Sequence, residues 1–384
     1  MVADVPADPN SGVAGTEFQT LLALRQLGHE VDALWADAMP RRIAHPNLHY
    51  LLELPRSFVR VIESACRRKD YDVIHCNQPH AYLAAKRHRR LGRPGVFVNR
   101  SHGFETHAAQ VLSQWRTRWA MPERVFPKNL PGWVIDAGMR RHCHQVLRFA
   151  DGVIVSCTLD REYILNKGGI SPERVAVIPQ AVPSLYQERT VACLTPERLN
   201  QLLVIGPPRF WKGPDVLGPA VSTLMARDPA VCLTWVCAST ERAVAAGFIT
   251  ASERGRVRFQ DPLPQERLID LYDRHGILLF PSLFEGFGKV FLEAMARGLC
   301  VVASNTGGMR DLISPGRDGL LVPVGDTDAL GKGIQWLLDH PGLAANMGVQ
   351  ARQTAQAYSW DRVGRETVDF YQHLAYLRQE NSGV

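Results

Sequence analysis

The sequence predicts an α/β protein with two domains, each built around a parallel sheet, and three observations support this. A chain of 384 residues is too long for one ordinary core and suits two domains. Short apolar segments alternate with stretches of helical periodicity, the order typical of parallel sheets covered by helices. A polar stretch with prolines at both ends, residues 183–197, separates two series of such units. We therefore expect two Rossmann-like domains with a cleft between them.

The expected strands are short apolar runs in each half. In the first half they are Val31–Trp35, Val73–Cys76, Val96–Asn99, Val153–Ser156 and Val175–Pro179. In the second half they are Leu202–Gly206, Cys232–Cys237, Val257–Gln260, Ile277–Pro281, Cys300–Ser304 and Leu320–Pro323. The opening, Met1–Asp4, is shorter than the usual strand of five or six residues. Either the first strand is stunted or the native chain begins upstream of Met1.

Composition favours a globular protein, because 46% of residues are hydrophobic and 21% are charged. No apolar run approaches the ~18 residues that span a bilayer. The first ten residues carry acidic side chains where a signal peptide is basic and then apolar. We therefore expect a soluble, cytoplasmic protein.

The net charge of +6 is unevenly distributed. Residues 51–150 hold 18 Lys and Arg against 7 Asp and Glu, and the densest run is Lys86–Arg90, followed by Arg93. Such a run is either a solvated helix face or a surface for an anionic partner, membrane headgroups or an acidic acceptor. Nucleic acid ranks last because the run lacks interleaved aromatic residues for stacking.

The eight cysteines form no CxxC pair, and several lie inside apolar runs. In a chain of this size without an export signal they are interpreted as small buried hydrophobes. The triplet His142-Cys143-His144 has no second ligand pair at metal-binding spacing. We interpret it as a helix surface with a half-buried thiol.

The turn at residues 282–288 is the strongest candidate site. It follows the strand Ile277–Pro281 and precedes a helix expected from Lys289 to Arg297 and ended by Gly298. A helix start offers free backbone N–H groups and partial positive charge to an anion or a sugar hydroxyl. Glu285 and Glu293 would each accept hydrogen bonds from one polyhydroxylated ligand. From spacing alone, a tight turn with a locally paired Glu293 is an equal alternative.

The segment FPSLFEGFGKVFLEAMARG resembles the E-x7-E signature of glycosyltransferase family 4, the group 1 retaining nucleotide-sugar transferases of the GT-B fold. SNTGGMRDLI, SPGRDGLLVPVGD and YSWDRVGRETVDFY resemble the elements that follow that signature in the family. Upstream, SGVAGTEFQTLLALRQLGHEV and SHGFE resemble its first glycine loop and its histidine element. The resemblance implies an N-terminal acceptor domain, 1–185, completed by a C-terminal helix at 362–384. Residues 186–361 would form the donor domain.

The resemblance also implies roles for single residues. Glu293 matches the ribose-binding carboxylate, and Glu285 the carboxylate that contacts the transferred sugar. Donor binding would also involve the turn residues Gly286, Phe287 and Gly288 and the glycine pair Gly307 and Gly308.

Three further positions fall in the N-terminal half. His102 matches a histidine near the donor sugar, and it follows the strand Val96–Asn99 at its carboxyl end, where α/β sites lie. Gly12 and Gly15 match a loop facing the diphosphate and acceptor.

The diphosphate segment departs from the family pattern. Lys212 is in register, but Pro207 stands where the family has Arg, and Arg209 follows two residues later. We expect Arg209 to replace the missing guanidinium, because phosphate clamping needs charge and donors rather than a fixed Cα. Asp326-Thr327-Asp328 is a D-x-D, but it precedes a helical run, so we expect a helix cap rather than a metal site.

The function implied is metal-independent transfer of a hexose, with retained configuration, from a nucleotide-diphosphate sugar to a glycan or lipid-linked acceptor. His102, Lys212, Arg209 and Glu285 would act in catalysis, with no cofactor. The role would be in cell-surface polysaccharide or lipopolysaccharide synthesis, and the basic 51–150 region would permit peripheral membrane contact. The alternatives are a catalytically weak scaffold, suggested by Pro207 and by Gln180-Ala181 in place of Asn-Gly, and a sugar-nucleotide epimerase on this fold.

Overall fold

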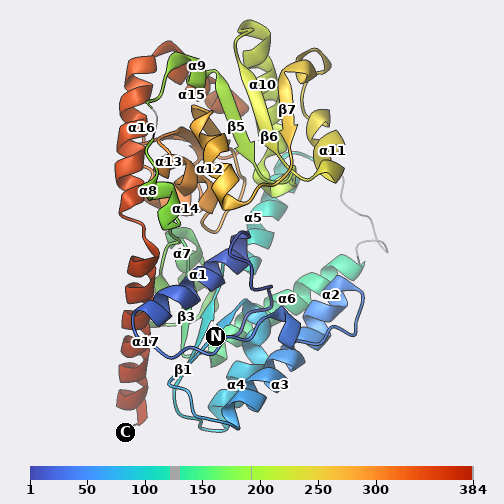
Figure 1. Cartoon of the computed structure of the whole chain (residues 1–384). Coiled ribbons are helices and arrows are strands. Elements are labelled where there is room, and N and C mark those ends of the chain that lie inside the picture. Colours follow the sequence, from blue (N-terminus) through green and yellow to red (C-terminus); the bar gives the residue numbers. More distant parts are fainter. Residues whose placement is uncertain (122–129, 192, 383–384) are drawn as a thin grey trace. The chain divides into compact units, whose positions relative to one another are not determined.

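The computed structural model describes residues 1–121, 130–191 and 193–382 and divides them into two compact units (Figure 1). The N-terminal unit comprises residues 1–180 and helix α17 (Trp360–Ser382), and the C-terminal unit is Ala181–Ser359. The divisions therefore fall after residues 180 and 359, whereas the sequence predicted them after 185 and 361.

The N-terminal unit contains a parallel sheet in the order β1-β2-β3-β4. Its strands are β1 (Val73–Asn77), β2 (Val96–Arg100), β3 (Gly152–Val155) and β4 (Val175–Val177). The sheet is nearly all buried, and Phe97 of β2 shares one hydrophobic core with Phe58 and Val146 from the helices. Its helices are α1 (Gly12–Gln26), α2 (Pro46–Leu48), α3 (Leu54–Cys66), α4 (Tyr82–Arg90), α5 (Glu105–Arg118), α6 (Leu130–Phe149) and α7 (Thr158–Gly168). Shorter turns are η1 (Ala36–Ala38), η2 (His49–Glu53), η3 (Pro79–Ala81) and η4 (Pro172–Arg174).

The expected strand at Val31–Trp35 does not form. Leu34 makes one isolated parallel bridge with Val2, and Val2 makes another with Cys76. The Val2 N–H donates to His75 O at 2.8 Å and the Ala3 N–H to Leu34 O at 2.9 Å. A strand needs a ladder of several paired residues, and Val2 supplies a single pair on each side. The opening of the chain is correspondingly a one-residue bridge.

The C-terminal unit contains a six-stranded parallel sheet in the order β10-β9-β8-β5-β6-β7. The strands are β5 (Gln201–Ile205), β6 (Cys232–Val236), β7 (Val257–Gln260), β8 (Ile277–Phe280), β9 (Cys300–Ser304) and β10 (Leu320–Val322). The helices are α8 (Ser184–Glu188), α9 (Pro196–Leu199), α10 (Pro214–Arg227), α11 (Arg242–Gly247), α12 (Gln265–Asp273), α13 (Lys289–Ala296), α14 (Gly307–Leu312), α15 (Thr327–Asp339) and α16 (Pro341–Gln356), with short turns η5 (Phe210–Lys212), η6 (Ser239–Glu241) and η7 (Ala251–Arg256). Because successive strands run outward in opposite directions from β5 and β8, the strand order reverses between these two. In open α/β sheets ligands bind outside the carboxyl ends of the strands at this reversal.

The cysteines are all free, and five of them are buried. The interpretation of His142-Cys143-His144 as a helix surface is wrong for its first two residues. His142 and Cys143 are both buried in α6, because the ring of His142 packs against Tyr82 at 4.5 Å and against His80 at 5.6 Å. Within the described ranges, the structure contains no helix long and apolar enough to cross a membrane.

Candidate functional site

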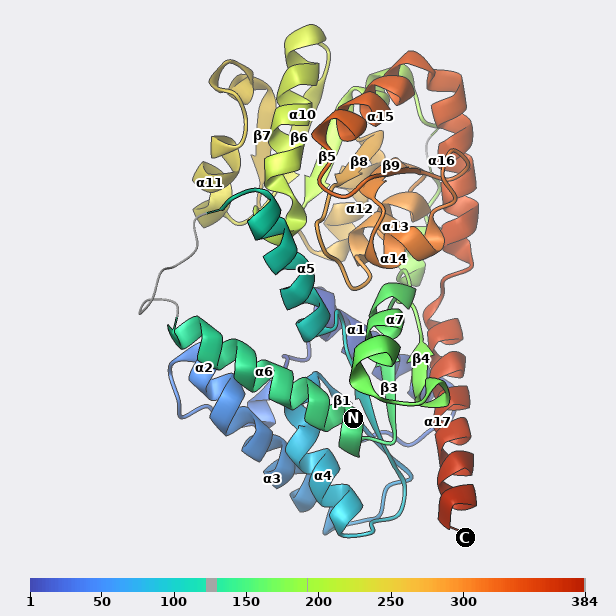
Figure 2. The same cartoon turned by 180° about the vertical axis from the view of Figure 1, so that it is seen from behind.

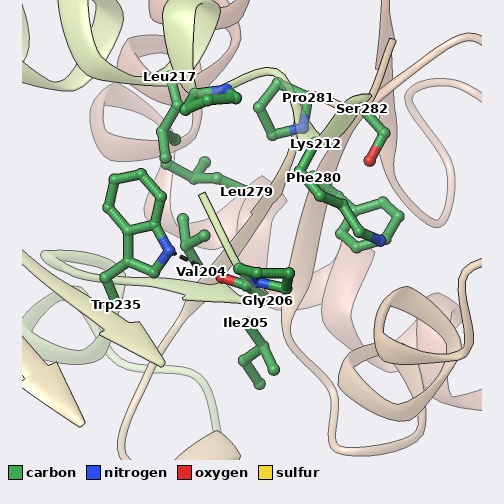
Figure 3. A pocket seen from close by; sticks show the side chains of 12 residues that line it. Val204, Ile205, Gly206, Lys212, Leu217, Trp235, Leu279, Phe280, Pro281 and Ser282 are labelled. Carbon is green, nitrogen blue, oxygen red and sulfur yellow. Dashed lines mark hydrogen bonds between the residues drawn. The ribbon is translucent and has the colours of Figure 1, made fainter. Parts of the chain in front are cut away.

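The C-terminal unit gathers its candidate residues where β5 and β8 end. Gly206 follows β5 with a backbone φ of +140°, a value that favours glycine, and the Trp235 indole N–H donates to its carbonyl at 3.0 Å. The chain then passes through η5 to Lys212. Gly206, Lys212, Trp235 and Ser282 line one small pocket between these strand ends (Figure 3).

Lys212 and Glu285 form the polar centre of this site. Lys212 Nζ lies 2.6 Å from Glu285 Oε2 and 4.8 Å from the centre of the Phe280 ring. The Ser282 hydroxyl donates to the same carboxylate oxygen at 3.3 Å. The Lys212 side chain is 24% exposed and that of Glu285 is 17% exposed, so the pair is partly desolvated yet reachable from solvent. The arrangement presents a fixed cation and a fixed hydrogen-bond acceptor to one ligand.

The pair Gly307-Gly308 packs directly against the turn that carries Glu285 and Phe287. A Cβ on Gly307, where φ is +53°, would lie 2.3 Å from Glu285 O, and a Cβ on Gly308 would lie 2.5 Å from the Phe287 ring. Gly288, with φ +90°, precedes α13 without a side-chain cap, so the first N–H groups of this helix point beyond its end. Gly286 lies in the same turn. The close packing fixes the backbone on which Glu285 is carried.

Glu293 lies one turn into α13 and is almost fully buried. Burial raises the pKa of its carboxyl group, while nearby Lys289 and a hydrogen bond from Tyr272 oppose that rise. The Tyr272 hydroxyl donates to Glu293 Oε2 at 2.9 Å. Glu293 is thus held in one orientation by a residue from α12 that no sequence motif indicated.

Arg209 is not brought to the Lys212–Glu285 pair. Its guanidinium pairs with Glu241 of η6 at 2.7 Å, and its side chain is 57% exposed.

The interpretation of Asp326 as a helix cap is confirmed, because its side chain accepts a hydrogen bond from the Ala329 N–H at 2.9 Å at the start of α15. The D-x-D segment is therefore a helix cap.

The N-terminal unit contains a second buried polar cluster, centred on Glu17 and His102. His102 follows β2, and its Nε2 lies 2.7 Å from Glu17 Oε1. An ionised carboxylate only accepts hydrogen bonds, so Nε2 is the protonated ring nitrogen. His75 Nε2 lies 3.6 Å from the other Glu17 oxygen, and His75 Nδ1 lies 2.5 Å from the Tyr371 hydroxyl. The described residues provide no hydrogen-bond partner for the buried Nδ1 of His102.

The charge of Glu17 is stabilised by this cluster. Burial alone would raise its pKa, but the hydrogen bond with His102, together with nearby His75 and Arg100, outweighs burial and lowers the pKa to about 2. The sequence motifs gave no role to Glu17. The available signal was a carboxylate at helical spacing from Leu21 and Leu24, on the face of α1 that is buried.

The expected loop at Gly12 and Gly15 is wrong. Both residues lie in the first turn of α1, which begins at Gly12, and the Gly15 N–H donates to Ser11 O at 3.1 Å. Helical hydrogen bonding therefore starts earlier than the glycine pattern indicated. A Cβ on Gly12 would meet no atom within 4 Å, so its backbone is open to approach.

The family comparisons match both units. Residues 187–354 match the model described as glycosyl transferases group 1, and residues 11–184 match the model described as glycosyltransferase family 4. A D-inositol 3-phosphate glycosyltransferase of Corynebacterium aurimucosum is 30% identical over 324 residues, covering 80% of this chain and 72% of that protein. The chain belongs to the group 1, family 4 glycosyltransferases.

One further curated relative aligns over less of its length, whereas two solved structures align over nearly all of theirs. The D-inositol 3-phosphate glycosyltransferase of Corynebacterium diphtheriae is 30% identical over 62% of this chain, and the match spans 60% of that protein. Sucrose-phosphate synthase from Thermosynechococcus elongatus has a TM-score of 0.74 at 22% identity, covering 97% of this chain and 98% of that one. Anabaena Alr3699/HepE, in complex with UDP and glucose, has a TM-score of 0.66 at 18% identity, covering 96% and 97%. Two parallel-sheet α/β units with these neighbours define the GT-B fold.

Proposed function

We propose that this protein transfers a hexose from a nucleotide-diphosphate sugar to a hydroxyl group of a glycan or lipid-linked acceptor. The observation that carries the proposal is the Lys212–Glu285 pair at the strand-order reversal of the C-terminal unit. A cation beside a helix start suits a diphosphate, and a fixed carboxylate suits sugar hydroxyls. Membership of the family supports this donor class, as does the likeness to HepE, whose crystal structure contains UDP and glucose.

Each donor contact has a proposed residue. Glu293 accepts hydrogen bonds from the ribose, Glu285 from the transferred sugar, and Lys212 binds the diphosphate. Gly307 and Gly308 lie against the turn that carries Glu285, so they position it rather than touch the sugar through side chains. Arg209 would join the diphosphate only after exchanging Glu241 for a phosphate, which its 57% exposure permits.

The proposed reaction retains the anomeric configuration. The bond between the anomeric carbon and the diphosphate oxygen breaks, and the bond to the acceptor oxygen forms on the same face. The acceptor proton passes to the leaving phosphate. Lys212 and the start of α13 would stabilise the developing negative charge without a metal ion. His102, oriented by Glu17, would act near the donor sugar, and Gly12 would allow the acceptor close to the backbone.

The acceptor is proposed from charge. The excess of Lys and Arg over residues 51–150 favours an anionic or lipid-linked acceptor, used at the cytoplasmic membrane surface in cell-surface polysaccharide or lipopolysaccharide synthesis. The curated relatives are named for an inositol phosphate, which is also anionic. Both acceptor types therefore belong in the test.

The test is nucleotide release from UDP-, GDP-, ADP- and dTDP-sugars, with D-inositol 3-phosphate, soluble glycans or extracted lipid-linked glycans as acceptors. We expect one donor to support acceptor-dependent release of its nucleotide in excess EDTA. NMR of the product should show the same anomeric configuration, axial or equatorial, as in the donor. Lys212→Ala should reduce turnover at least ~100-fold, the scale of losing one transition-state charge contact. Acceptor-independent interconversion of the sugar at one carbon would instead identify an epimerase, and no turnover with any pair would contradict the proposal.

A further inference from the structure

The N-terminal unit exposes a group of large apolar side chains that the donor site does not use. Leu48 of α2 is 47% exposed and Leu52 of η2 is 48% exposed, while Trp133 and Val134 in the first turns of α6 are 64% and 51% exposed. Tyr50 is also exposed. We name these five residues the apolar patch. Exposed apolar clusters of this kind on soluble folds mark interaction surfaces.

The patch is continuous because η2 packs along α6. A Cβ on Gly138 of α6 would lie 2.7 Å from a methyl carbon of Leu51, so the two segments touch there. Val134 precedes Gly138 by one helical turn and lies on the same face of α6. Both views place α2 beside the first turns of α6 (Figures 1 and 2). Leu48 and Leu52 flank Leu51 on one of these segments, and Trp133 and Val134 lie one helical turn before Gly138 on the other.

The patch is bordered by basic side chains. Leu48, Leu52, Arg56 and Arg60 are spaced four residues apart along the continuous helical run from α2 to α3, and all four are exposed. The run thus presents exposed apolar residues near its start and exposed arginines further along. Further exposed arginines lie on the loop before α2 and on α6, namely Arg41, Arg42, Arg140 and Arg141.

Within the described segments, two acidic residues lie near the patch, and one of them is already engaged. Asp136 of α6 is exposed near Trp133. Glu53 faces inward, where its carboxylate accepts hydrogen bonds from the Arg42 and Ile43 N–H groups and lies 2.8 Å from His49 Nδ1. This pairing anchors the loop that carries Arg41 and Arg42 to the base of the helical run. Among the residues that the structure describes, the charge facing solvent around the patch is predominantly positive.

We propose that the apolar patch and its arginines form the surface by which the protein rests on an anionic phospholipid bilayer. Apolar and aromatic side chains enter the boundary between headgroups and acyl chains, and arginines pair with the phosphates around them. Trp133 is well suited to this boundary because its indole combines a large apolar surface with one polar N–H. The inference deepens the membrane contact in the proposed function and places it on α2, η2, α3 and the start of α6.

The test is sedimentation of the full chain with vesicles of phosphatidylcholine alone or with 30% phosphatidylglycerol, at 0.05 M and 0.5 M KCl. We expect binding only to the anionic vesicles, weakened but not abolished at 0.5 M KCl. Leu52→Ser combined with Trp133→Ser should lower the partition coefficient at least ~10-fold at both salt concentrations, since each lost apolar contact is independent of charge. The matched control is Leu343→Ser with Val349→Ser, two residues of α16 that are 51% and 56% exposed in the C-terminal unit.

Several outcomes overturn the proposal. Equal binding by the patch variant and the control variant excludes insertion of the patch, and binding lost entirely at 0.5 M KCl reduces the contact to charge alone. If the wild type binds no vesicles but forms a dimer in light scattering, and the patch variant abolishes that dimer, the patch belongs to a contact with a second copy of the chain.

A second measurement uses brominated lipids, which should quench the tryptophan fluorescence of the wild-type protein more than that of Trp133→Phe. Nucleotide binding by the same preparations separates failure of this surface from failure of the donor site.

Discussion

Replacing Glu17 by Gln tests whether the N-terminal unit is organised around a buried charge. Glu17 is 1% exposed, and its pKa is lowered from 4.5 to about 2 despite burial. A shift of this size corresponds to about 3 kcal/mol of net stabilisation of the ionised form. Gln keeps the shape and removes the charge, so it should lower the stability of the folded unit by about that amount at pH 7. For a unit of about 200 residues this is roughly 6–12 °C in midpoint.

The assay is thermal unfolding of the whole chain, followed by tryptophan fluorescence from pH 7 to pH 8.5, where His75, with a pKa of about 4, stays neutral. Because the folded pKa of Glu17 is depressed, its contribution is fully present above the unfolded value and is lost only as pH falls toward 2. The difference between wild type and Glu17→Gln should therefore stay constant over this range. The matched control is Glu30→Gln, which removes an 84% exposed partner of Lys69 and should move the midpoint by no more than about 2 °C. Equal effects of the two variants would show that the buried charge does not stabilise the unit, as would a difference that changes between pH 7 and pH 8.5.

Two further predictions concern the C-terminal unit. Tyr272→Phe removes the hydrogen bond that lowers the pKa of Glu293, so that pKa should rise further above its usual value. Nucleotide affinity should therefore begin to fall at a higher pH in the variant than in the wild type. Titration calorimetry across pH 5–8 would show this shift, and an unchanged profile would contradict it. Gly307→Ala forces a Cβ within 2.3 Å of Glu285 O at a positive φ, so it should destabilise the unit by more than ~1 kcal/mol in urea titrations. Gly331→Ala, where a Cβ meets no atom within 4 Å inside α15, should instead stabilise it by about 0.5–1 kcal/mol, and similar effects of the two alanines would exclude the packing argument.

Most strands were predictable from apolar runs because strands buried on both faces need continuous apolar sequence. The run at Val31–Trp35 has the same character but no ladder, since strand formation also depends on a neighbour of adequate length. The neighbouring segment at the start of the chain pairs with Leu34 through Val2 alone, and the composition of the run at 31–35 does not reveal this. Helix α13 begins at Lys289, as the glycine pattern indicated, whereas α1 begins at Gly12 despite its two glycines.

The candidate site was predictable where its residues are close in sequence. The glycine turn and Glu293 share one strand–turn–helix unit, so spacing alone juxtaposes them. The partners that orient these groups come from elsewhere: Tyr272 reaches Glu293 from α12, and Glu17 reaches His102 across 85 positions. Arg209 shows the converse, because Glu241 of another loop engages it and spacing gave no sign of this partner. Long-range partners are fixed by tertiary packing, which local patterns do not encode.

The proposed function depends above all on the binding of a nucleotide diphosphate to the C-terminal unit through Glu293 and Lys212. The most direct measurement is a thermal-shift panel with UDP, GDP, ADP and dTDP in excess EDTA, using wild type and Glu293→Ala. A nucleotide at ~100 times its dissociation constant adds about 2.7 kcal/mol, which is roughly 5–11 °C for a unit of this size. We predict such a shift for one nucleotide in the wild type and its loss in the variant. An equal shift in both proteins would contradict the ribose assignment, and the absence of a shift with every nucleotide would contradict the donor site itself.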